Sequence, residues 1–324
     1  TAYAAKIYRE YGKESIDKVK ENPYRLADDI WGIGFKTADG IAGKMGYEKE
    51  DQRRCRSGIL YTLGQLSDEG HVYAEEGQLV KTAGQLLEAG EAPIRDAMDE
   101  MIRAEELILD KEAIYLPPFY HAECGTARRL RDLSEPAGGS LFGTSFDPAL
   151  LAEEVGVEYD EVQIAAIRQS VTSKAMVLTG GPGTGKTTTV SGILRVFEAL
   201  SLNTLLAAPT GRAAKRLSDL TGMEAKTIHR LLEAGFAGGG RTVFARSVTN
   251  PLECDAVILD EVSMVDIRLM QALIEALPHG ARLVLVGDAD QLPPVGPGNF
   301  LRDIIASQRV PTIQLTEIFR QSAE

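Results

Sequence analysis

Residues 180–187 read Gly180-Gly-Pro-Gly-Thr-Gly-Lys-Thr187, which is the pattern of a phosphate-binding loop. The apolar run Met176-Val-Leu178 precedes the loop, and a helical pattern follows it from Thr188. In this setting the glycines turn backbone N–H groups onto phosphates, and the helix adds its positive end. We expect Lys186 to reach the β- and γ-phosphates and the Thr187 hydroxyl to hold Mg²⁺. A glycine-rich turn without a ligand is the alternative, but it gives no reason for the lysine and the threonine.

Short apolar runs recur along the second half of the chain, at residues 175–179, 204–208, 256–259, 283–286 and 313–315. Helical patterns separate them, and no internal repeat occurs. Continuous apolar runs that alternate with helices indicate a parallel sheet buried on both faces. The second half of the chain is therefore expected to be an α/β P-loop NTPase domain. The loop alone does not separate kinases, GTPases, transporters and helicases, so other residues must narrow the function.

Two carboxylates, Asp260 and Glu261, directly follow the apolar run Ala256–Leu259. They are expected at the carboxyl end of a central strand, where parallel sheets bind their ligands. We assign Asp260 to the hydrated Mg²⁺ and Glu261 to the general base that polarises the attacking water. An acidic pair at a strand end is also common on protein surfaces, and only the phosphate loop nearby favours the metal site.

Three further polar residues complete the expected nucleotide site. Gln291 follows the run Leu283–Val286 and is a candidate sensor of the γ-phosphate, unless this stretch is only an acidic turn that ends at Pro293-Pro294. Arg320 lies just beyond the last run and is a candidate arginine finger, or else a surface arginine. Gln163 can bond the adenine edge through both of its amide groups, which favours ATP. The residues expected to hold the nucleotide are Gln163, Gly181, Pro182, Gly183, Thr184, Gly185, Lys186, Thr187 and Thr188.

Residues 1–133 have a mostly helical pattern, with apolar side chains at three-to-four spacing. Near the end of this region, Leu107–Leu109 and Ala113–Leu116 flank a polar turn. That pattern predicts a β-hairpin closed by Pro117-Pro118 and a winged-helix-like unit. Turn-forming residues in Ser134-Glu-Pro-Ala-Gly-Gly-Ser140 predict a linker over residues 134–146, so the P-loop domain is expected at 147–324.

Composition limits the kinds of partner. The 324 residues carry a formal net charge of −12, which argues against coating nucleic acid through bulk charge. Three cysteines without a C-x-x-C pair indicate a reducing cytosol rather than a disulfide framework or a zinc site. No apolar run of about 18 residues and no signal-peptide order occur, so we expect no membrane contact. Local basic clusters could still bind phosphates, or each could be only a solvated helix face. These clusters are Arg53-Arg54-Arg56, Arg128-Arg129-Arg131 and Arg212-Lys215-Arg216.

From Gln163 to Gln321 the chain resembles the RecD-like branch (superfamily 1B) of superfamily 1 DNA helicases, of the bacterial type with a long N-terminal region. Five family motifs occur in order, which makes the resemblance specific. Motifs I, Ia, II, III and IV resemble Gly180–Thr187, Ala208–Ala214, Asp260–Ser263, Gly287–Pro294 and Phe319–Gln321. The resemblance implies a RecA-like P-loop domain, the cofactors ATP and Mg²⁺, and hydrolysis of ATP to ADP and phosphate. It further implies 5′-to-3′ movement on single-stranded DNA.

The same resemblance implies where DNA binds. The expected strand contacts are Pro209, Thr210, Gly211, Arg212, Thr227 and His229. His229 has packing against a helix as its alternative role. Residues Gly238–Ser247 are expected to form a β-hairpin, in the region 236–250, like the strand-splitting pin of this family. A glycine-rich surface loop is the alternative.

Residues 23–45 resemble a helix-hairpin-helix element with Gly32-Ile-Gly34 at its turn. Such a turn holds a phosphate through backbone N–H groups at a helix start and does not read bases. Gly32 and Gly34 are therefore candidate DNA-binding residues, with an ordinary glycine turn as the alternative. Trp31 is the only tryptophan, and we expect it in the core rather than as a stacking platform.

Superfamily 1 motors clamp ATP between two RecA-like domains, and the motifs of the second domain do not occur in these residues. We therefore expect the chain to be part of a longer protein and to hydrolyse ATP weakly or not at all by itself. Expected partners are single-stranded DNA and tailed duplex DNA, bound by a monomer in the bacterial cytoplasm at the nucleoid. Nuclease or repair partners remain open, although no nuclease carboxylate cluster is evident in the chain itself. The alternatives are an RNA helicase or annealing translocase, and a scaffold subunit of a nuclease–helicase complex.

Overall fold

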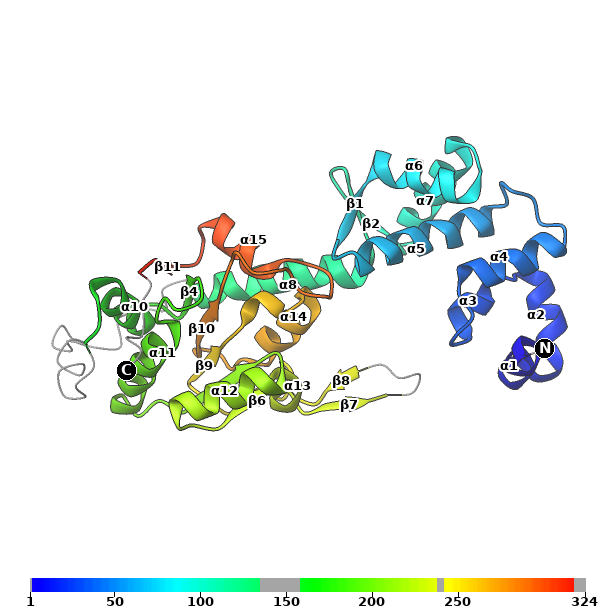
Figure 1. The fold of residues 1–324 in the computed structure, drawn as a ribbon. Helices are drawn as coiled ribbons and strands as arrows, with labels where there is room; N and C mark the ends of the chain where they lie inside the picture. Colours follow the sequence, from blue (N-terminus) through cyan, green and yellow to red (C-terminus); the bar gives the residue numbers. More distant parts are fainter. Residues whose placement is uncertain (1, 135–157, 238–241, 318–324) are drawn as a thin grey trace. The chain divides into compact units, whose positions relative to one another are not determined.

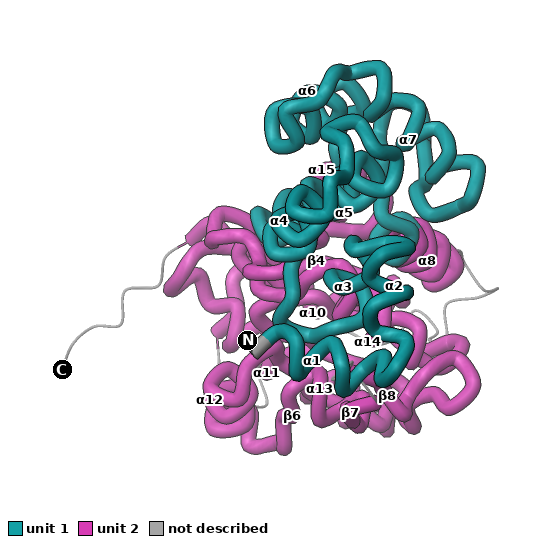
Figure 2. Tube along the Cα trace, turned by 90° about the vertical axis from the view of Figure 1, so that its right-hand side faces the viewer, with its two compact units in different colours: residues 1–120 teal, residues 121–324 magenta. Residues whose placement is uncertain are grey.

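The computed structural model describes residues 2–134, 158–237 and 242–317. The chain divides into two compact units, Thr1–Tyr120 and His121–Glu324 (Figure 2). The division falls inside helix α8 (Pro117–Ser134), whereas the sequence pattern placed the end of the helical domain at residue 133. The expected linker 134–146, apart from Ser134, lies outside the described residues, and so does the expected arginine finger Arg320.

The first unit is mostly helical and has its own core (Figure 1). Apolar side chains at three-to-four spacing on successive helices meet there, and Ile59, Leu79 and Ile94 have no exposed surface. In chain order the elements are α1 (Ala2–Tyr11), the 3₁₀ helix η1 (Gly12–Glu14), α2 (Ser15–Glu21), α3 (Arg25–Asp29), α4 (Phe35–Lys44), α5 (Gln52–Asp68), β1 (Tyr73–Glu75), α6 (Glu76–Leu87), α7 (Glu91–Arg103), β2 (Ile108–Asp110) and β3 (Ala113–Tyr115).

The three short strands form an antiparallel sheet in the order β1-β3-β2. Leu109 of β2 pairs with Ile114 of β3, which confirms the predicted hairpin beside the helices. The proline pair does not close this hairpin as a turn. Pro117 and Pro118 instead open α8, because a helix leaves the N–H groups of its first turn unpaired and proline has none to lose.

Trp31 does not belong to the core of the first unit, so the prediction for this residue is wrong. The side chain is 91% exposed. Its apolar neighbours Ile30 and Ile33 take the buried positions on either side of it, at 6% and 2% exposure. The turn is therefore held by two buried isoleucines while the indole faces outward.

The second unit contains a six-stranded parallel sheet in the order β11-β4-β10-β9-β5-β6 (Figure 1). It confirms the predicted α/β class and all five predicted strands. The strands are β4 (Ala175–Gly180), β5 (Thr204–Ala208), β6 (Ala225–Thr227), β9 (Ala256–Leu259), β10 (Arg282–Gly287) and β11 (Thr312–Leu315). The helices are α10 (Glu161–Thr172), α11 (Lys186–Ala199), α12 (Gly211–Thr221), α13 (Ile228–Leu231), the 3₁₀ helix η2 (Val262–Met264), α14 (Ile267–Ala276) and α15 (Phe300–Ser307).

Every residue of β4, β9 and β10 is buried, which explains why their sequences are apolar without alternation. One face of the sheet packs against apolar side chains of α10, α11 and α12, with Phe197 fully buried among them. Because the strands are parallel, their carboxyl ends meet along one edge. Gly180, Ala208, Leu259 and Gly287 end their strands there.

A separate β-hairpin leaves this unit at β7 (Ala234–Phe236) and β8 (Thr242–Phe244), where Phe236 pairs with Thr242 (Figure 1). The sequence placed a hairpin in this region, but its strands begin before Gly238, and residues 238–241 lie outside the described residues. Arg246 fixes the base of the hairpin, since its Nε donates to Glu233 at 2.9 Å. Phe236 is 86% exposed.

Candidate active site and nucleic-acid interface

The phosphate loop joins β4 to α11 in a conformation that needs its glycines. Gly183 and Gly185 have φ angles of 80° and 83°, in the left-handed region that favours glycine. A Cβ atom at Gly180 would lie 2.7 Å from the carbonyl oxygen of Leu315, so a side chain does not fit there. Lys186 Nζ donates to the carbonyl oxygen of Gly181 at 2.8 Å, which holds the ammonium group over the loop.

One cavity of about 880 Å³ brings most of the predicted nucleotide residues together. It joins the phosphate loop, the two carboxylates after β9 and the amide after β10, although their segments are far apart in the chain. The lining residues that the sequence predicted are Gln163, Pro182, Gly183, Thr184, Gly185, Lys186, Thr187, Thr188, Asp260, Glu261 and Gln291. The predicted residue Gly181 does not line the cavity, and its carbonyl oxygen accepts from Lys186 instead.

The carboxylates after β9 are in an environment that disfavours their charge. Burial raises the pKa of Asp260, against the smaller opposing effects of its backbone hydrogen bond, Lys186 and Arg216. Burial, and then the charge of Asp260, raise the pKa of Glu261. Glu261 also has a φ of 54°, which is uncommon for a residue other than glycine and turns the chain sharply after the strand. Two partly desolvated carboxylates next to one lysine form a site that a divalent cation would stabilise.

The oxygen groups at this edge fit Mg²⁺. Its usual protein ligands are one or two carboxylate or hydroxyl oxygens, with phosphates and water completing the octahedron. Thr187 and Asp260 both line the cavity and supply such oxygens. Among the described residues no cluster of three or more His, Cys, Asp or Glu side chains occurs, so a metal cage made of protein groups alone is absent from this part of the chain.

Gln291 is linked to the segment that follows the two carboxylates. Its Oε1 accepts a hydrogen bond from Ser263 Oγ at 3.1 Å. Ser263 belongs to η2, directly after Glu261 and Val262. The amide is therefore held at the cavity by the same segment that positions the general-base candidate.

Gln163 has a structural role that the sequence interpretation missed. Its side chain is 2% exposed and closes a capping box at the start of α10. Gln163 Oε1 accepts from the backbone N–H of Asp160 at 3.1 Å, and Asp160 Oδ1 accepts from the backbone N–H of Gln163 at 2.8 Å. The carbonyl half of the amide is thus engaged, which leaves Nε2 as the group that can donate to a base.

Six lining residues were not predicted: Glu158, Tyr159, Ser191, Arg195, Arg216 and Leu220. Spacing offered a signal for two of them. Thr187, Ser191 and Arg195 recur every four residues along α11, so they share one face of that helix. Tyr159 lies against the same helix, because a Cβ atom at Gly192 would come within 3.0 Å of its hydroxyl oxygen. Arg216 had been noted only as part of a basic cluster.

The two predicted strand-contacting segments lie side by side at the carboxyl edge. Ala208 of β5 is in register with Thr227 of β6, so the residues that follow each strand are neighbours. The two threonines cap the helices that begin there: Thr210 Oγ1 accepts from the N–H of Ala213 at 3.2 Å, and Thr227 Oγ1 accepts from the N–H of Arg230 at 3.2 Å. The positive ends of α12 and α13 therefore point in the direction of these loops.

His229 lies on the exposed side of α13, with its ring 5.8 Å from the ring of Phe244 on β8. The alternative role was packing against a helix, but the ring that the imidazole contacts belongs to the hairpin. The contact joins the predicted strand-contacting segment to the base of the hairpin.

Comparison with known proteins agrees with this arrangement. Residues 163–297 match the family model described as an AAA domain, and residues 1–73 match the model of the ATP-dependent RecD2 DNA helicase HHH domain. The ATP-dependent RecD2 DNA helicase of Deinococcus radiodurans is 35% identical over 337 residues, which cover 99% of this chain and 46% of that protein. The chain is thus similar to a RecD2 DNA helicase over nearly its whole length.

Other relatives match a smaller part of the chain. The RecBCD enzyme subunit RecD of Mycobacterium tuberculosis is 38% identical over 228 residues, covering 61% of this chain and 36% of that protein. The ATP-dependent DNA helicase dda of phage T4 is 32% identical over 154 residues, covering 46% of this chain and 35% of that protein. The chain spans less than half the length of each of these relatives.

The first unit of this RecD-like chain carries the predicted helix-hairpin-helix turn. Gly32 has a φ of 85°, and Gly34 is the N-cap of α4 without a side-chain cap. Because glycine has no side chain, Gly34 leaves the first N–H groups of α4 without a side-chain cap, as expected for a turn that holds a phosphate. Within the described residues, none of the helices is both long and apolar enough to cross a bilayer.

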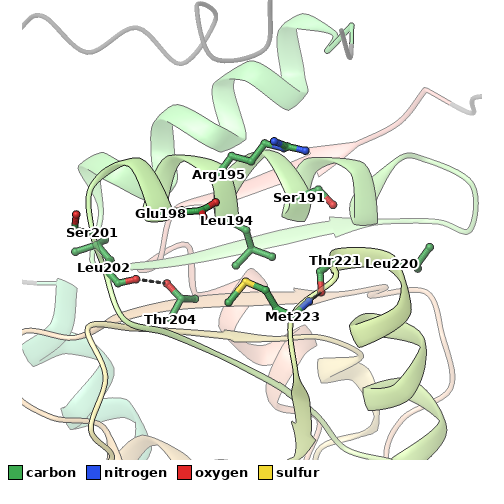
Figure 3. A pocket seen from close by; sticks show the side chains of 10 residues that line it. All are labelled: Ser191, Leu194, Arg195, Glu198, Ser201, Leu202, Thr204, Leu220, Thr221 and Met223. Atoms are coloured by element: carbon green, nitrogen blue, oxygen red, sulfur yellow. Dashed lines mark hydrogen bonds between the residues drawn. The ribbon is translucent and has the colours of Figure 1, made fainter. Parts of the chain in front are cut away.

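A second cavity of about 480 Å³ lies beside the nucleotide cavity and shares Ser191, Arg195 and Leu220 with it (Figure 3). Leu194, Leu202 and Met223 contribute apolar side chains to its wall. It contains no residue of the phosphate loop and neither carboxylate. The chemistry for a nucleotide therefore resides in the larger cavity.

Proposed function

We propose that this chain is the ATP-hydrolysing front part of a RecD-like DNA helicase, which converts ATP into ADP and phosphate to move along single-stranded DNA. The observation that carries the proposal is the single cavity that joins the phosphate loop to Asp260, Glu261 and Gln291. Sequence identity of 35% over nearly the whole chain to a RecD2 DNA helicase supports the same assignment.

Within that cavity each group has a proposed role. Bound Mg²⁺ would neutralise the phosphate charge, with Thr187 and Asp260 as its protein-side ligands. Lys186 binds the β- and γ-phosphates, and Gln291 senses the γ-phosphate. Glu261 accepts the proton of the attacking water, and burial, which raises the pKa of this carboxyl, makes it a better base than an exposed glutamate. Gln163 contacts the adenine through Nε2, and Arg320 is a second proposed phosphate contact.

The proposed DNA path runs over the carboxyl edge, across the loops that follow β5 and β6. The positive ends of α12 and α13 suit a phosphate backbone. The strand-contacting residues are Pro209, Thr210, Gly211, Arg212, Thr227 and His229. We further propose that the motor moves from 5′ to 3′ on the strand. The β7–β8 hairpin, with Phe236 exposed, would separate the two strands of a duplex. The Gly32 and Gly34 turn would hold a further phosphate.

The proposed substrates are single-stranded DNA and tailed duplex DNA, engaged by a monomer in the cytoplasm at the nucleoid. The name of the RecBCD relatives suggests nuclease or repair partners, without requiring them. An RNA helicase is distinguished by contacts to the 2′-hydroxyl, so DNA and RNA oligonucleotides of one sequence separate the two functions. A scaffold subunit would bind its partners whether or not Lys186 is present.

The test is ATP hydrolysis by the longer protein that contains this chain, and Mg²⁺-ATP binding by the chain itself, each with and without single-stranded DNA. We expect DNA to stimulate hydrolysis in the longer protein. Lys186→Ala should lower hydrolysis by at least 100-fold, because the transition-state charge loses its lysine. A hydrolysis rate that neither DNA nor RNA changes would contradict the motor function and indicate a P-loop enzyme of another class.

A further inference from the structure

An exposed tryptophan stands out in the first unit. Trp31 has 91% of its side chain exposed, although burying an indole removes a large apolar surface from water. The turn that carries it is not loose, since Ile30 and Ile33 are buried and the N–H of Ile33 donates to the carbonyl of Ile30 at 3.0 Å. A firmly held turn that directs an indole outward presents a flat apolar face for a ligand.

A cation accompanies this face. Lys6 Nζ lies 5.9 Å from the centre of the Trp31 ring and donates to the carbonyl oxygen of Trp31 at 3.3 Å. A Cβ atom at Gly32 would come within 2.9 Å of the same nitrogen, so the absence of a side chain at Gly32 makes room for the lysine. The ammonium group is therefore held beside the indole rather than moving freely.

The carboxylate of Asp29, two residues before Trp31, is engaged elsewhere. Asp29 Oδ2 accepts from the hydroxyl of Tyr11 at 2.8 Å and pairs with Arg25 at 3.6 Å. Lys6 has no ion pair with any carboxylate in the part of the chain that the structure describes. The positive charge beside the indole is thus available to an anionic ligand.

We propose that Trp31 and Lys6 form a site for one unpaired nucleotide, with the base stacked on the indole and its phosphate next to the ammonium group. A flat aromatic face beside a cation matches a base and its phosphate. In a duplex the faces of internal bases are covered by their neighbours, so the site selects single strands or frayed ends. This inference rests on the proposed DNA-motor function and adds base stacking to a turn that by itself only holds a phosphate.

Because the chain has one tryptophan, its emission reports this site alone. The experiment is a titration of the full chain, without ATP, with oligothymidylate and with a blunt hairpin duplex, while anisotropy of a labelled oligonucleotide reports total binding. We expect saturable quenching of Trp31 by oligothymidylate and little by the duplex. Trp31→Ala should weaken oligothymidylate binding by roughly 10-fold, and Trp31→Phe should restore much of it, since stacking on an aromatic ring contributes on that order.

The matched control is Tyr8→Ala, which removes an aromatic ring that is 61% exposed on α1 and should leave binding unchanged. Thermal unfolding of each variant reports folding, and an exposed ring should be removable without a loss of stability. Unchanged Trp31 emission at concentrations where anisotropy shows bound oligonucleotide would overturn the inference but leave the motor function intact. Equal quenching by the blunt duplex would also overturn it, and no binding of any nucleic acid would overturn both.

Discussion

At the scale of single residues, Asp260 illustrates how a ligand site lowers the stability of the empty protein. The folded chain raises the pKa of this carboxyl through burial, so it binds a proton more tightly when folded than when unfolded. At neutral pH the ionised carboxylate therefore destabilises the fold, and this cost disappears as pH falls through the raised pKa. A bound cation would offset the same cost.

We predict that Asp260→Asn raises the stability of the ligand-free chain at pH 7 by about 1 kcal/mol, or a few degrees in melting temperature. The asparagine retains an oxygen that can accept from the N–H of Glu261, now at 2.9 Å. The gain should disappear at acidic pH, once the pH has fallen through the raised pKa of Asp260, and Mg²⁺-ATP should no longer stabilise the variant. Thermal melts at both pH values measure this, with Asp219→Asn on the exposed surface of α12 as the control. A stability gain that persists at low pH would show that burial of the charge is not its cause.

That the phosphate loop and Asp260-Glu261 lie at one cavity was predictable from sequence, because both follow apolar runs that form parallel strands of one sheet. Two other lining residues were not predictable: Arg216, which reaches the cavity from the middle of α12, and Tyr159, which lies just before α10. Trp31 was misassigned because composition cannot reveal which of the nearby apolar residues Ile30, Trp31 and Ile33 faces out. Gln163 was assigned only to the adenine, while its carbonyl oxygen accepts from the N–H of Asp160 in the capping box.

At the scale of elements, α12 connects the two proposed ligand sites. It begins at the strand-contacting loop with Thr210 as its N-cap, and Arg216 lines the nucleotide cavity within two turns of that end. Arg212 and Arg216 lie four residues apart on the same helix and line a common surface patch with Lys215. A displacement of this helix by DNA would therefore move a cation in the nucleotide cavity.

We predict that Arg216→Ala weakens Mg²⁺-ATP binding by roughly 5- to 10-fold and leaves single-stranded DNA affinity unchanged, since one charge-assisted contact is lost. Arg212→Ala should do the reverse, and should reduce the dependence of DNA affinity on salt by about one phosphate contact. Nucleotide and oligonucleotide titrations of both variants provide the comparison. If both variants lose affinity for the same ligand, Arg212 and Arg216 serve one site, and the proposed separation of their roles is wrong.

The long strands of the parallel sheet were predicted better than the short edge strand β6, the β7–β8 hairpin and the start of α8. The five predicted strands have apolar runs long enough to be recognised, whereas the edge strand β6 has only the three residues Ala225-Lys-Thr227 and carries no such signal. The hairpin was anticipated from its glycines, but its first strand lies before them. Pro117-Pro118 was interpreted as a stop, although the same residues can begin a helix.

At the scale of the whole molecule, α8 is shared between the two compact units, and the division at Tyr120 differs from the expected boundary at residue 133. The helix continues to Ser134, so periodicity gives no break, but from His121 it packs with the P-loop unit. Arg129 makes that attachment: its Nη2 donates to the carbonyl oxygen of Leu277, just after α14, at 2.9 Å. Its Nη1 lies 3.2 Å from Nδ1 of His279. The basic cluster Arg128-Arg129-Arg131 thus has at least one member with a structural role.

We predict that Arg129→Ala destabilises the P-loop unit by about 1–2 kcal/mol, because the Leu277 carbonyl loses a charged donor. Arg128→Ala is the matched control, since Arg128 is exposed and its replacement removes the same charge. Mg²⁺-ATP binds only the P-loop unit and should raise its unfolding transition by mass action, which identifies that transition in a thermal scan. Arg129→Ala should lower this ATP-sensitive transition and leave the other unit unaffected. If it lowers only the ATP-insensitive transition, the second half of α8 belongs with the helical unit, and the boundary lies near residue 133 as the sequence pattern suggested.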